Sequence, residues 1–295
     1  MKKVLGDKKM ILLFLMPAFL VYLFVIFIPI AWSAGYSFFS WDGVGEMKFV
    51  GLGNYLKMFK DRYFVNALKN NFWYMFINVL LQVFGGFLVA LLLAKVKRGS
   101  GFFKTMYYAP SIISGVAIGK TFQKVLSLKP EGVINGLLRI VGLGDLARSW
   151  LSRPTSALIW VCLIESYKNI GLYILIFFAA LISIPSDVTD AAKLDGATGF
   201  KDLIYIKFPM IKSVFTIVLI MVVNGTLKAF DIAFAATGGG PGNATELVSM
   251  YMYRLTFSAN QYGYGSSLAV FIAIESIIAV VLIRKICGAN SAQDI

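Results

Sequence analysis

The residues best suited to chemistry are charged side chains that stand inside long apolar runs. Glu165 and Lys168 lie three positions apart in one run, and Lys228 and Asp231 have the same spacing in the next. Residues three apart on a helix share a face and can pair. A charge at the centre of a membrane helix costs about 2.5–3.5 kcal/mol on insertion scales, so such residues usually face a partner or a polar cavity. We therefore predict an intramembrane ion pair between Lys228 and Asp231, and a cavity-facing role for Glu165 and Lys168.

The sequence lacks the residue patterns usual for catalytic and metal sites. The chain has no histidine, and its two cysteines, Cys162 and Cys287, lie in apolar runs without disulfide or metal spacing. The stretch SGVAIGKT (114–121) differs from a phosphate-binding loop at one position, where Ser114 stands in place of glycine. It lies in an apolar run rather than between a strand and a helix. Gly115 and Gly119 instead have the G-x-x-x-G spacing that lets membrane helices pack closely. We predict a chain that is not an enzyme, holds no metal and binds no cofactor itself.

The elements that position these residues must be membrane spans. Hydrophobic residues make up 58% of the 295 residues and charged residues only 15%, whereas soluble domains carry about 25% charged residues. A span needs about 20 predominantly apolar residues. We predict an all-α polytopic membrane protein with one transmembrane domain (10–287) between tails at 1–9 and 288–295. Its six spans are predicted at about residues 10–30, 72–94, 107–126, 155–184, 211–236 and 266–283.

The distribution of lysine and arginine predicts the orientation. The formal charge is +13, but the cations gather in short loops rather than in a basic arm, which argues against nucleic acid. They are dense before the first span, between the second and third, between the fourth and fifth, and after the sixth. The positive-inside rule therefore places both termini in the cytoplasm. The first apolar run is longer than a signal-peptide core and lacks a clear cleavage site, so we expect an uncleaved span.

The segment between the fourth and fifth spans, residues 185–210, is polar although lipid requires no such segment. A proline–serine pair is typical of a helix start, and Gly196 fits the residue that ends this short helix in a left-handed conformation. Ala191 and Ala192 leave a nearly flat surface, and Phe200 offers an aromatic anchor. We predict a rigid helix–turn–helix that docks against another protein. An amphipathic loop lying on lipid headgroups is the alternative.

Two stretches carry a resemblance to a known family. Asp190-Ala191-Ala192, Gly196 and Ile206–Pro209 have the spacing of the EAA motif, E-A-A-x3-G-x9-I-x-L-P, with Asp190 for Glu and Phe208 for Leu. This motif is the cytoplasmic coupling loop of permease subunits in type I ABC importers. A proline often seen shortly after it is replaced here by lysine. The stretch 228–270, with its T-G-G-G-P run, resembles the MalF-like and glycerol-phosphate permeases of carbohydrate importers, and the resemblance extends over nearly the whole chain.

The resemblance implies a type I ABC importer permease fold in a prokaryotic plasma membrane, with the loop Asp190–Pro209 as the coupling helix region. It implies half of a pathway for a sugar or sugar-like solute that an extracellular binding protein delivers. Implied partners are a second permease in a heterodimer and two ATPase subunits, which bind ATP and Mg. The residues implied in ATPase coupling are Asp190, Ala191, Ala192, Asp195, Gly196, Ala197, Phe200, Ile206, Phe208 and Pro209. The residues implied along the solute pathway are Glu165, Tyr167, Lys168, Asn169, Gly225, Thr226 and Ala229.

Two other functional classes stay open at this point. A secondary transporter driven by an ion gradient would show internal repeats around a midplane site, and no repeat is visible. A membrane enzyme would need a paired acid, a nucleophile with its base or a metal group, and none is found in the sequence. The solute is also open, because Glu165 disfavours an anion whereas Lys168 and Lys228 favour one.

Overall fold

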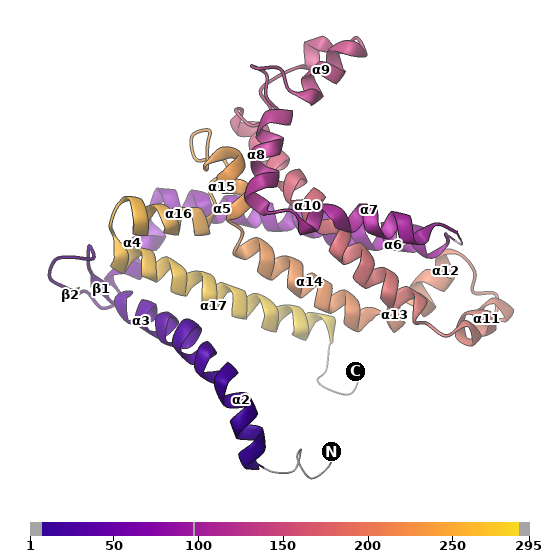
Figure 1. The fold of residues 1–295 in the computed structure, drawn as a ribbon, viewed down its shortest axis with the longest axis horizontal. Helices are drawn as coiled ribbons and strands as arrows, with labels where there is room; N and C mark the ends of the chain where they lie inside the picture. Colours follow the sequence, from indigo (N-terminus) through magenta and orange to yellow (C-terminus); the bar gives the residue numbers. More distant parts are fainter. Residues whose placement is uncertain (1–7, 97, 289–295) are drawn as a thin grey trace. The chain divides into compact units, whose positions relative to one another are not determined.

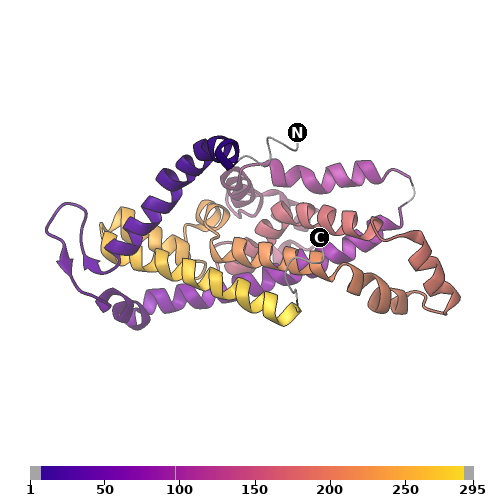
Figure 2. The same cartoon turned by 90° about the horizontal axis from the view of Figure 1, so that it is seen from below.

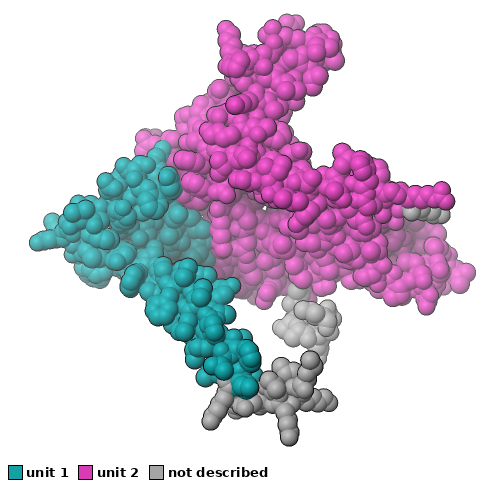
Figure 3. Space-filling view, in the orientation of Figure 1, with its two compact units in different colours: residues 1–61, 252–273 teal, residues 62–251, 274–295 magenta. Residues whose placement is uncertain are grey.

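The computed structural model describes residues 8–96 and 98–288, which divide into two compact units (Figure 3). One unit comprises residues 1–61 and 252–273, and the other comprises residues 62–251 and 274–295. Most of the two predicted tails, 1–9 and 288–295, lies outside the described residues.

The first unit begins with a long apolar helix and continues into a small hairpin. The helix over Met10–Tyr36 has none of its most apolar window buried within the chain, as suits a segment that contacts lipid or a partner. In the hairpin, Phe39 pairs with Phe49 and Ser40 with Lys48 in antiparallel register, a small exception to the all-α prediction. The elements are α2 (Lys8–Tyr22), π-helical η1 (Leu23–Phe27), α3 (Ile28–Tyr36), β1 (Phe39–Ser40), β2 (Lys48–Phe49), α4 (Gly53–Lys60) and π-helical η5 (Arg254–Ser258).

The second unit is a helical bundle. Its elements are α5 (Arg62–Asn78), η2 (Val79–Gly85), α6 (Gly86–Ala94), α7 (Ser100–Ile112), α8 (Gly115–Val125), α9 (Val133–Ile140), η3 (Gly144–Leu146), α10 (Pro154–Ile182), α11 (Ser186–Leu194), α12 (Phe200–Asp202), η4 (Leu203–Lys207), α13 (Phe208–Met210), α14 (Lys212–Leu227) and α15 (Asp231–Thr237). Two helices, α16 (Val248–Tyr253) and α17 (Tyr262–Cys287), cross the boundary between the units.

Helix α10 is the centre of this bundle, because α6 and α7 both pack along it (Figures 1 and 2). Close approach depends on Gly171, where a Cβ would overlap the backbone carbonyl of Tyr107 in α7. Rings of Phe87, Phe177 and Phe215 join α6, α10 and α14, with centroids 5.4 to 6.2 Å apart. Aromatic side chains bury large apolar areas and prefer such tilted and edge-on contacts, so this cluster fixes the three helices together.

Four helices are long and apolar enough to cross a membrane: Met10–Tyr36, Arg62–Ala94, Pro154–Ile182 and Tyr262–Cys287. They coincide with the first, second, fourth and sixth predicted spans. A further candidate is the pair Phe200–Met210 and Lys212–Leu227, which is bent by 73°. The helical, polytopic character of the chain is therefore confirmed, and the count of six spans stays a prediction.

The third and fifth predicted spans are not continuous helices. The stretch 107–126 is divided between α7 and α8, because Ile113 and Ser114 are extended (ψ 141° and 136°) just after a proline within α7. The stretch 211–236 is divided between α14 and α15 at residues 228–230. Backbone outside a helix is tolerated at membrane depth where it is buried in protein or lines a cavity. The second break lies at such a cavity.

The G-x-x-x-G pair of α8 packs against α15, as the spacing predicted. A Cβ at Gly115 would lie 3.1 Å from the Cβ of Asp231, and one at Gly119 would lie 2.8 Å from the Cβ of Ala235. The segment that resembles a phosphate-binding loop is therefore a helix with a small-residue packing face.

We expect Gly119→Leu to lower the free energy of unfolding by about 1–3 kcal/mol, because overpacking a tight helix contact forces the backbones apart. Denaturant unfolding of the purified chain in detergent measures this. Gly136→Leu is the matched control, since Gly136 is also helical but has no atom within 4 Å of an added Cβ. Equal losses from both substitutions would contradict the packing role.

Candidate functional site

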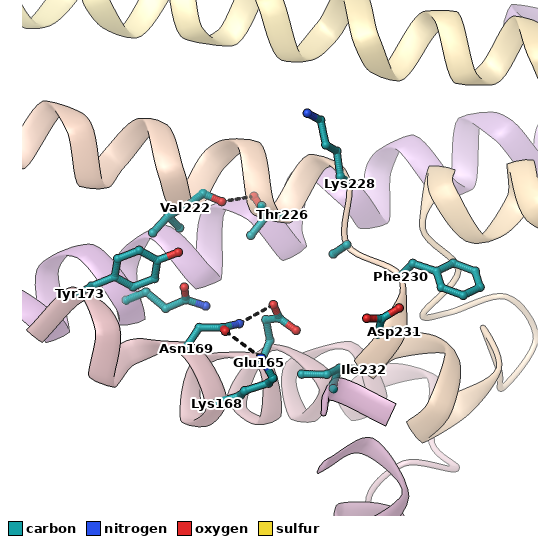
Figure 4. Close-up of a pocket in the computed structure, with 14 residues that line it drawn as sticks. Glu165, Lys168, Asn169, Tyr173, Val222, Thr226, Lys228, Phe230, Asp231 and Ile232 are labelled. Carbon is teal, nitrogen blue, oxygen red and sulfur yellow. Dashed lines mark hydrogen bonds between the residues drawn. The ribbon is translucent and has the colours of Figure 1, made fainter. Parts of the chain in front are cut away.

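A polar cavity of about 330 Å³ lies in the second unit, where α10 faces the end of α14 and the break before α15 (Figure 4). Its walls come from segments far apart in the sequence, which the bundle brings together. The lining residues are Gln82, Gly115, Glu165, Lys168, Asn169, Tyr173, Val222, Gly225, Thr226, Lys228, Ala229, Phe230, Asp231 and Ile232.

The charges on α10 are joined by an amide. Asn169 Nδ2 donates to Glu165 Oε1 at 2.7 Å, and Lys168 Nζ donates to Asn169 Oδ1 at 3.4 Å (Figure 4). Asn169 thus connects a carboxylate and an ammonium group that do not meet directly. Hydrogen bonds to charged groups contribute more than neutral ones, so this bridge fixes the three side chains relative to one another on the face of α10 that lines the cavity.

The predicted ion pair between Lys228 and Asp231 is not formed in the described structure. The prediction assumed an uninterrupted helix, but α14 ends at Leu227 and Lys228 has left the helix (φ −104°, ψ 4°). The ammonium group of Lys228 points away from Asp231 in Figure 4. Both residues instead line the cavity from the two sides of the break.

Six of the seven residues predicted along the solute pathway line this cavity, namely Glu165, Lys168, Asn169, Gly225, Thr226 and Ala229. The seventh, Tyr167, lies elsewhere, with its ring edge-on to Phe122 at 5.3 Å. Sequence reasoning missed Gln82 and Tyr173. Gln82 could have been found because it is a polar interruption of the second predicted span. Tyr173 could have been found because it stands two turns beyond Glu165 on the same helix.

A buried polar cluster supports the cavity from behind. Gln82 Nε2 donates to Asn78 Oδ1 at 2.8 Å, and Ser166 Oγ donates to the same oxygen at 3.0 Å. The amide of Asn78 in turn donates to the carbonyl of Tyr74 at 2.9 Å. Because buried polar groups are stable only when hydrogen-bonded, this cluster holds η2 and α10 in one register and places Gln82 at the cavity wall.

The loop between α10 and α14 has the predicted helix–turn–helix form. Helix α11 ends in a Schellman motif, in which Gly196 has φ +78°, its N–H donates to Lys193, and the N–H of Ala197 donates to Ala192 at 2.8 Å. An added Cβ at Gly196 would meet no atom within 4 Å, so the backbone conformation, and not space, requires glycine.

The outward face of the loop differs from the predicted one. Ala191 is exposed, but Ala192 is only 6% exposed and therefore does not contribute to a flat docking face. The prominent apolar groups are Phe200, as predicted, and Leu194, which sequence reasoning missed and which is 90% exposed. Asp195 is exposed beside them.

Charged and aromatic contacts stiffen the loop. Asp190 pairs with Lys193 at 2.7 Å, and this hydrogen bond raises the pKa of Lys193. Lys207 pairs with Asp202 at 2.6 Å. The ring of Phe208 lies edge-on to Phe215 at 5.3 Å. Of the motif's last residues, Phe208 therefore joins the aromatic cluster, Pro209 is exposed beside it, and Ile206 and Ala197 are half-buried.

Comparison with known proteins decides which family this arrangement represents. Residues 71–287 match the family described as "Binding-protein-dependent transport system inner membrane component". The chain belongs to this family. It is similar to the probable ABC transporter permease protein YurN of Bacillus subtilis (strain 168), with 34% identity over 266 residues that cover 89% of this chain and 90% of that protein.

Two further similarities extend the comparison. The trehalose/maltose transport system permease protein MalF of Thermococcus litoralis is 30% identical over 241 residues, or 81% of this chain and 80% of that protein. The fold matches a chain of a bacterial ABC transporter involved in the import of the acidic polysaccharide alginate, with a TM-score of 0.83, 20% identity and 99% coverage of both chains. The permease fold predicted from the EAA-like spacing is thus confirmed.

The chain is therefore a multi-pass permease subunit of an ABC importer and not an enzyme. The alternative of a secondary transporter finds no support in these comparisons.

We expect Asn169→Leu to lower the free energy of unfolding of the permease by about 1–3 kcal/mol, because it removes the hydrogen bond that Asn169 donates to the partly buried carboxylate of Glu165. Denaturant unfolding in detergent measures the change. Adding Glu165→Leu to this variant removes the carboxylate as well and should recover part of the loss. A double variant as unstable as the sum of the single ones would show that the bridge contributes nothing.

Proposed function

We propose that this permease forms half of the translocation pathway for a sugar or sugar-like solute, and that the loop Asp190–Pro209 couples the pathway to ATPase subunits. The observation that carries the proposal is how the chain connects the loop to the cavity. Helices α10 and α14, which line the cavity, are the two helices that the loop joins. A displacement of the loop therefore acts directly on both cavity walls.

The cavity suits a hydroxyl-rich solute. Its wall carries two lysines and two carboxylates, so it has no formal net charge, together with the amides of Gln82 and Asn169 and the ring of Tyr173. Ligand sites combine apolar surface with a few placed polar groups that fix orientation. The relatives named above for trehalose and maltose, and the structural neighbour involved in alginate import, support a saccharide as the solute class.

The coupling role falls to the exposed side of the loop. Leu194 and Phe200 offer apolar surface to a partner, while Gly196 sets the turn between them. The contact of Phe208 with Phe215 anchors the end of the loop to α14, so that a movement of the loop would be passed to that helix. Asp195 is placed to meet a basic group of the ATPase.

The complete transporter should contain further subunits. The family is defined by dependence on a binding protein, and we propose a second permease in a heterodimer and two ATPase subunits as the other partners. ATP and Mg would be bound by the ATPases, and this chain would hold no cofactor. We propose six spans from the apolar runs, and both termini and the coupling loop in the cytoplasm from the cation distribution. The family resemblance supports a prokaryotic plasma membrane as the location.

We expect Gly225→Phe to abolish solute uptake while Gly225→Ala retains it. An added Cβ at Gly225 meets no atom within 4 Å, so alanine fits and favours the helix, whereas a phenyl ring enters the cavity. Uptake of maltose, trehalose and an alginate trisaccharide by proteoliposomes with the complete transporter and ATP measures the effect. Normal uptake by the phenylalanine variant, or wild-type uptake without ATP, would contradict the proposal.

A further inference from the structure

A second polar cavity, of about 550 Å³, lies in the unit formed by residues 1–61 and 252–273. Its walls come from the β1–β2 hairpin, helix α4 and the chain around the start of α17, and it shares no lining residue with the first cavity. The side chains that matter for recognition are Trp41, Asp42, Glu46, Lys48, Lys57 and Gln261.

Buried hydrogen bonds hold the walls of this cavity in place. Asn54, only 7% exposed, donates from Nδ2 to the carbonyls of Ser37 and Phe39 at 2.8 and 2.9 Å. Tyr264, 4% exposed, donates from its hydroxyl to Asp61 Oδ2 at 2.8 Å. These bonds tie α4 to the hairpin and to α17, so the cavity is formed before any ligand binds.

The charged groups around the cavity are held apart. Asp42 Oδ1 accepts the N–H groups of Val44 at 3.1 Å and Gly45 at 2.7 Å, and these bonds lower the pKa of Asp42, which keeps it ionised. The ammonium group of Lys57 lies 4.3 Å from the ring centroid of Tyr264. No ion pair joins any two of the four charged residues that line this cavity, all of which the structure describes.

Unpaired carboxylates and ammonium groups around one space restrict the ligand. An anion or a cation would meet a like charge, whereas a hydroxyl group donates to a carboxylate and accepts from an ammonium group. The Trp41 ring, which lies 5.0 Å from Tyr36 and 5.7 Å from Tyr262 between centroids, adds a rigid apolar wall. The volume falls within the range of about 300–1,000 Å³ found for ligand sites.

From these contacts we propose that this second cavity is a saccharide-binding site, separate from the translocation pathway. The hairpin and α4 lie between the first and second spans in sequence, and Gln261 lies between the fifth and sixth. The cation distribution places both segments on the outer side of the membrane. The site would therefore meet the solute before it enters the membrane.

The test uses the two permeases with their ATPases in lipid nanodiscs, without the binding protein, which would itself bind saccharide, and calorimetric titration with maltose and trehalose. A Gly225→Phe background blocks the first cavity, so binding that remains reports the second. We expect Glu46→Gln combined with Lys57→Met, which preserves the net charge, to weaken that binding at least about tenfold. Val44→Ala is the control, because Val44 is 96% exposed on the same hairpin and does not line the cavity.

The proposal is overturned if no saccharide binds in the Gly225→Phe background, or if the double variant binds like the control. It is also overturned if the double variant still binds saccharide and loses only the association with added binding protein. In that case a loop of the binding protein would be the occupant of the cavity. Uptake experiments with Gly225→Ala test the pathway independently, so failure of one site is distinguishable from failure of the other.

Discussion

One covalent constraint underlies the rest of the structure: the polar loop joins the two helices that line the candidate cavity. Helix α10 carries Glu165 and Asn169 into the cavity and continues through Pro185 into α11. Helix α14 starts after the loop and brings Gly225 to the opposite wall. Force applied at the loop would therefore reach the candidate solute site directly, along these two helices.

Such a lever works only if its parts do not yield. The Schellman turn at Gly196 sets the shape of the loop, and the contact of Phe208 with Phe215 anchors its C-terminal end to the core of the bundle. The cavity, in contrast, adjoins a stretch without helix at residues 228–230. The aromatic contact with the loop and the non-helical cavity wall thus lie at opposite ends of α14.

Local spacing predicted local features well, because each depends on a few neighbouring residues. The turn at Gly196, the packing face of Gly119 and the cavity-facing position of Glu165 were predictable in this way, whereas the position of Asn169 was implied by the family resemblance. The break after Leu227 was not, because an apolar run looks the same whether or not tertiary contacts interrupt its helix. The inward position of Ala192 and the exposure of Leu194 depend likewise on how the loop folds back, which composition does not specify.

The most direct test of the account is co-purification of ATPase subunits with Gly196→Val and Gly142→Val permeases. Both glycines have similar positive φ, +78° and +80°, and open space at the Cβ, so valine strains both turns alike. If the loop couples the permease to the ATPases, the ATPases and a second permease are lost from Gly196→Val and retained by Gly142→Val. Retention in both variants, or wild-type permease that purifies alone and transports without ATP, would contradict it.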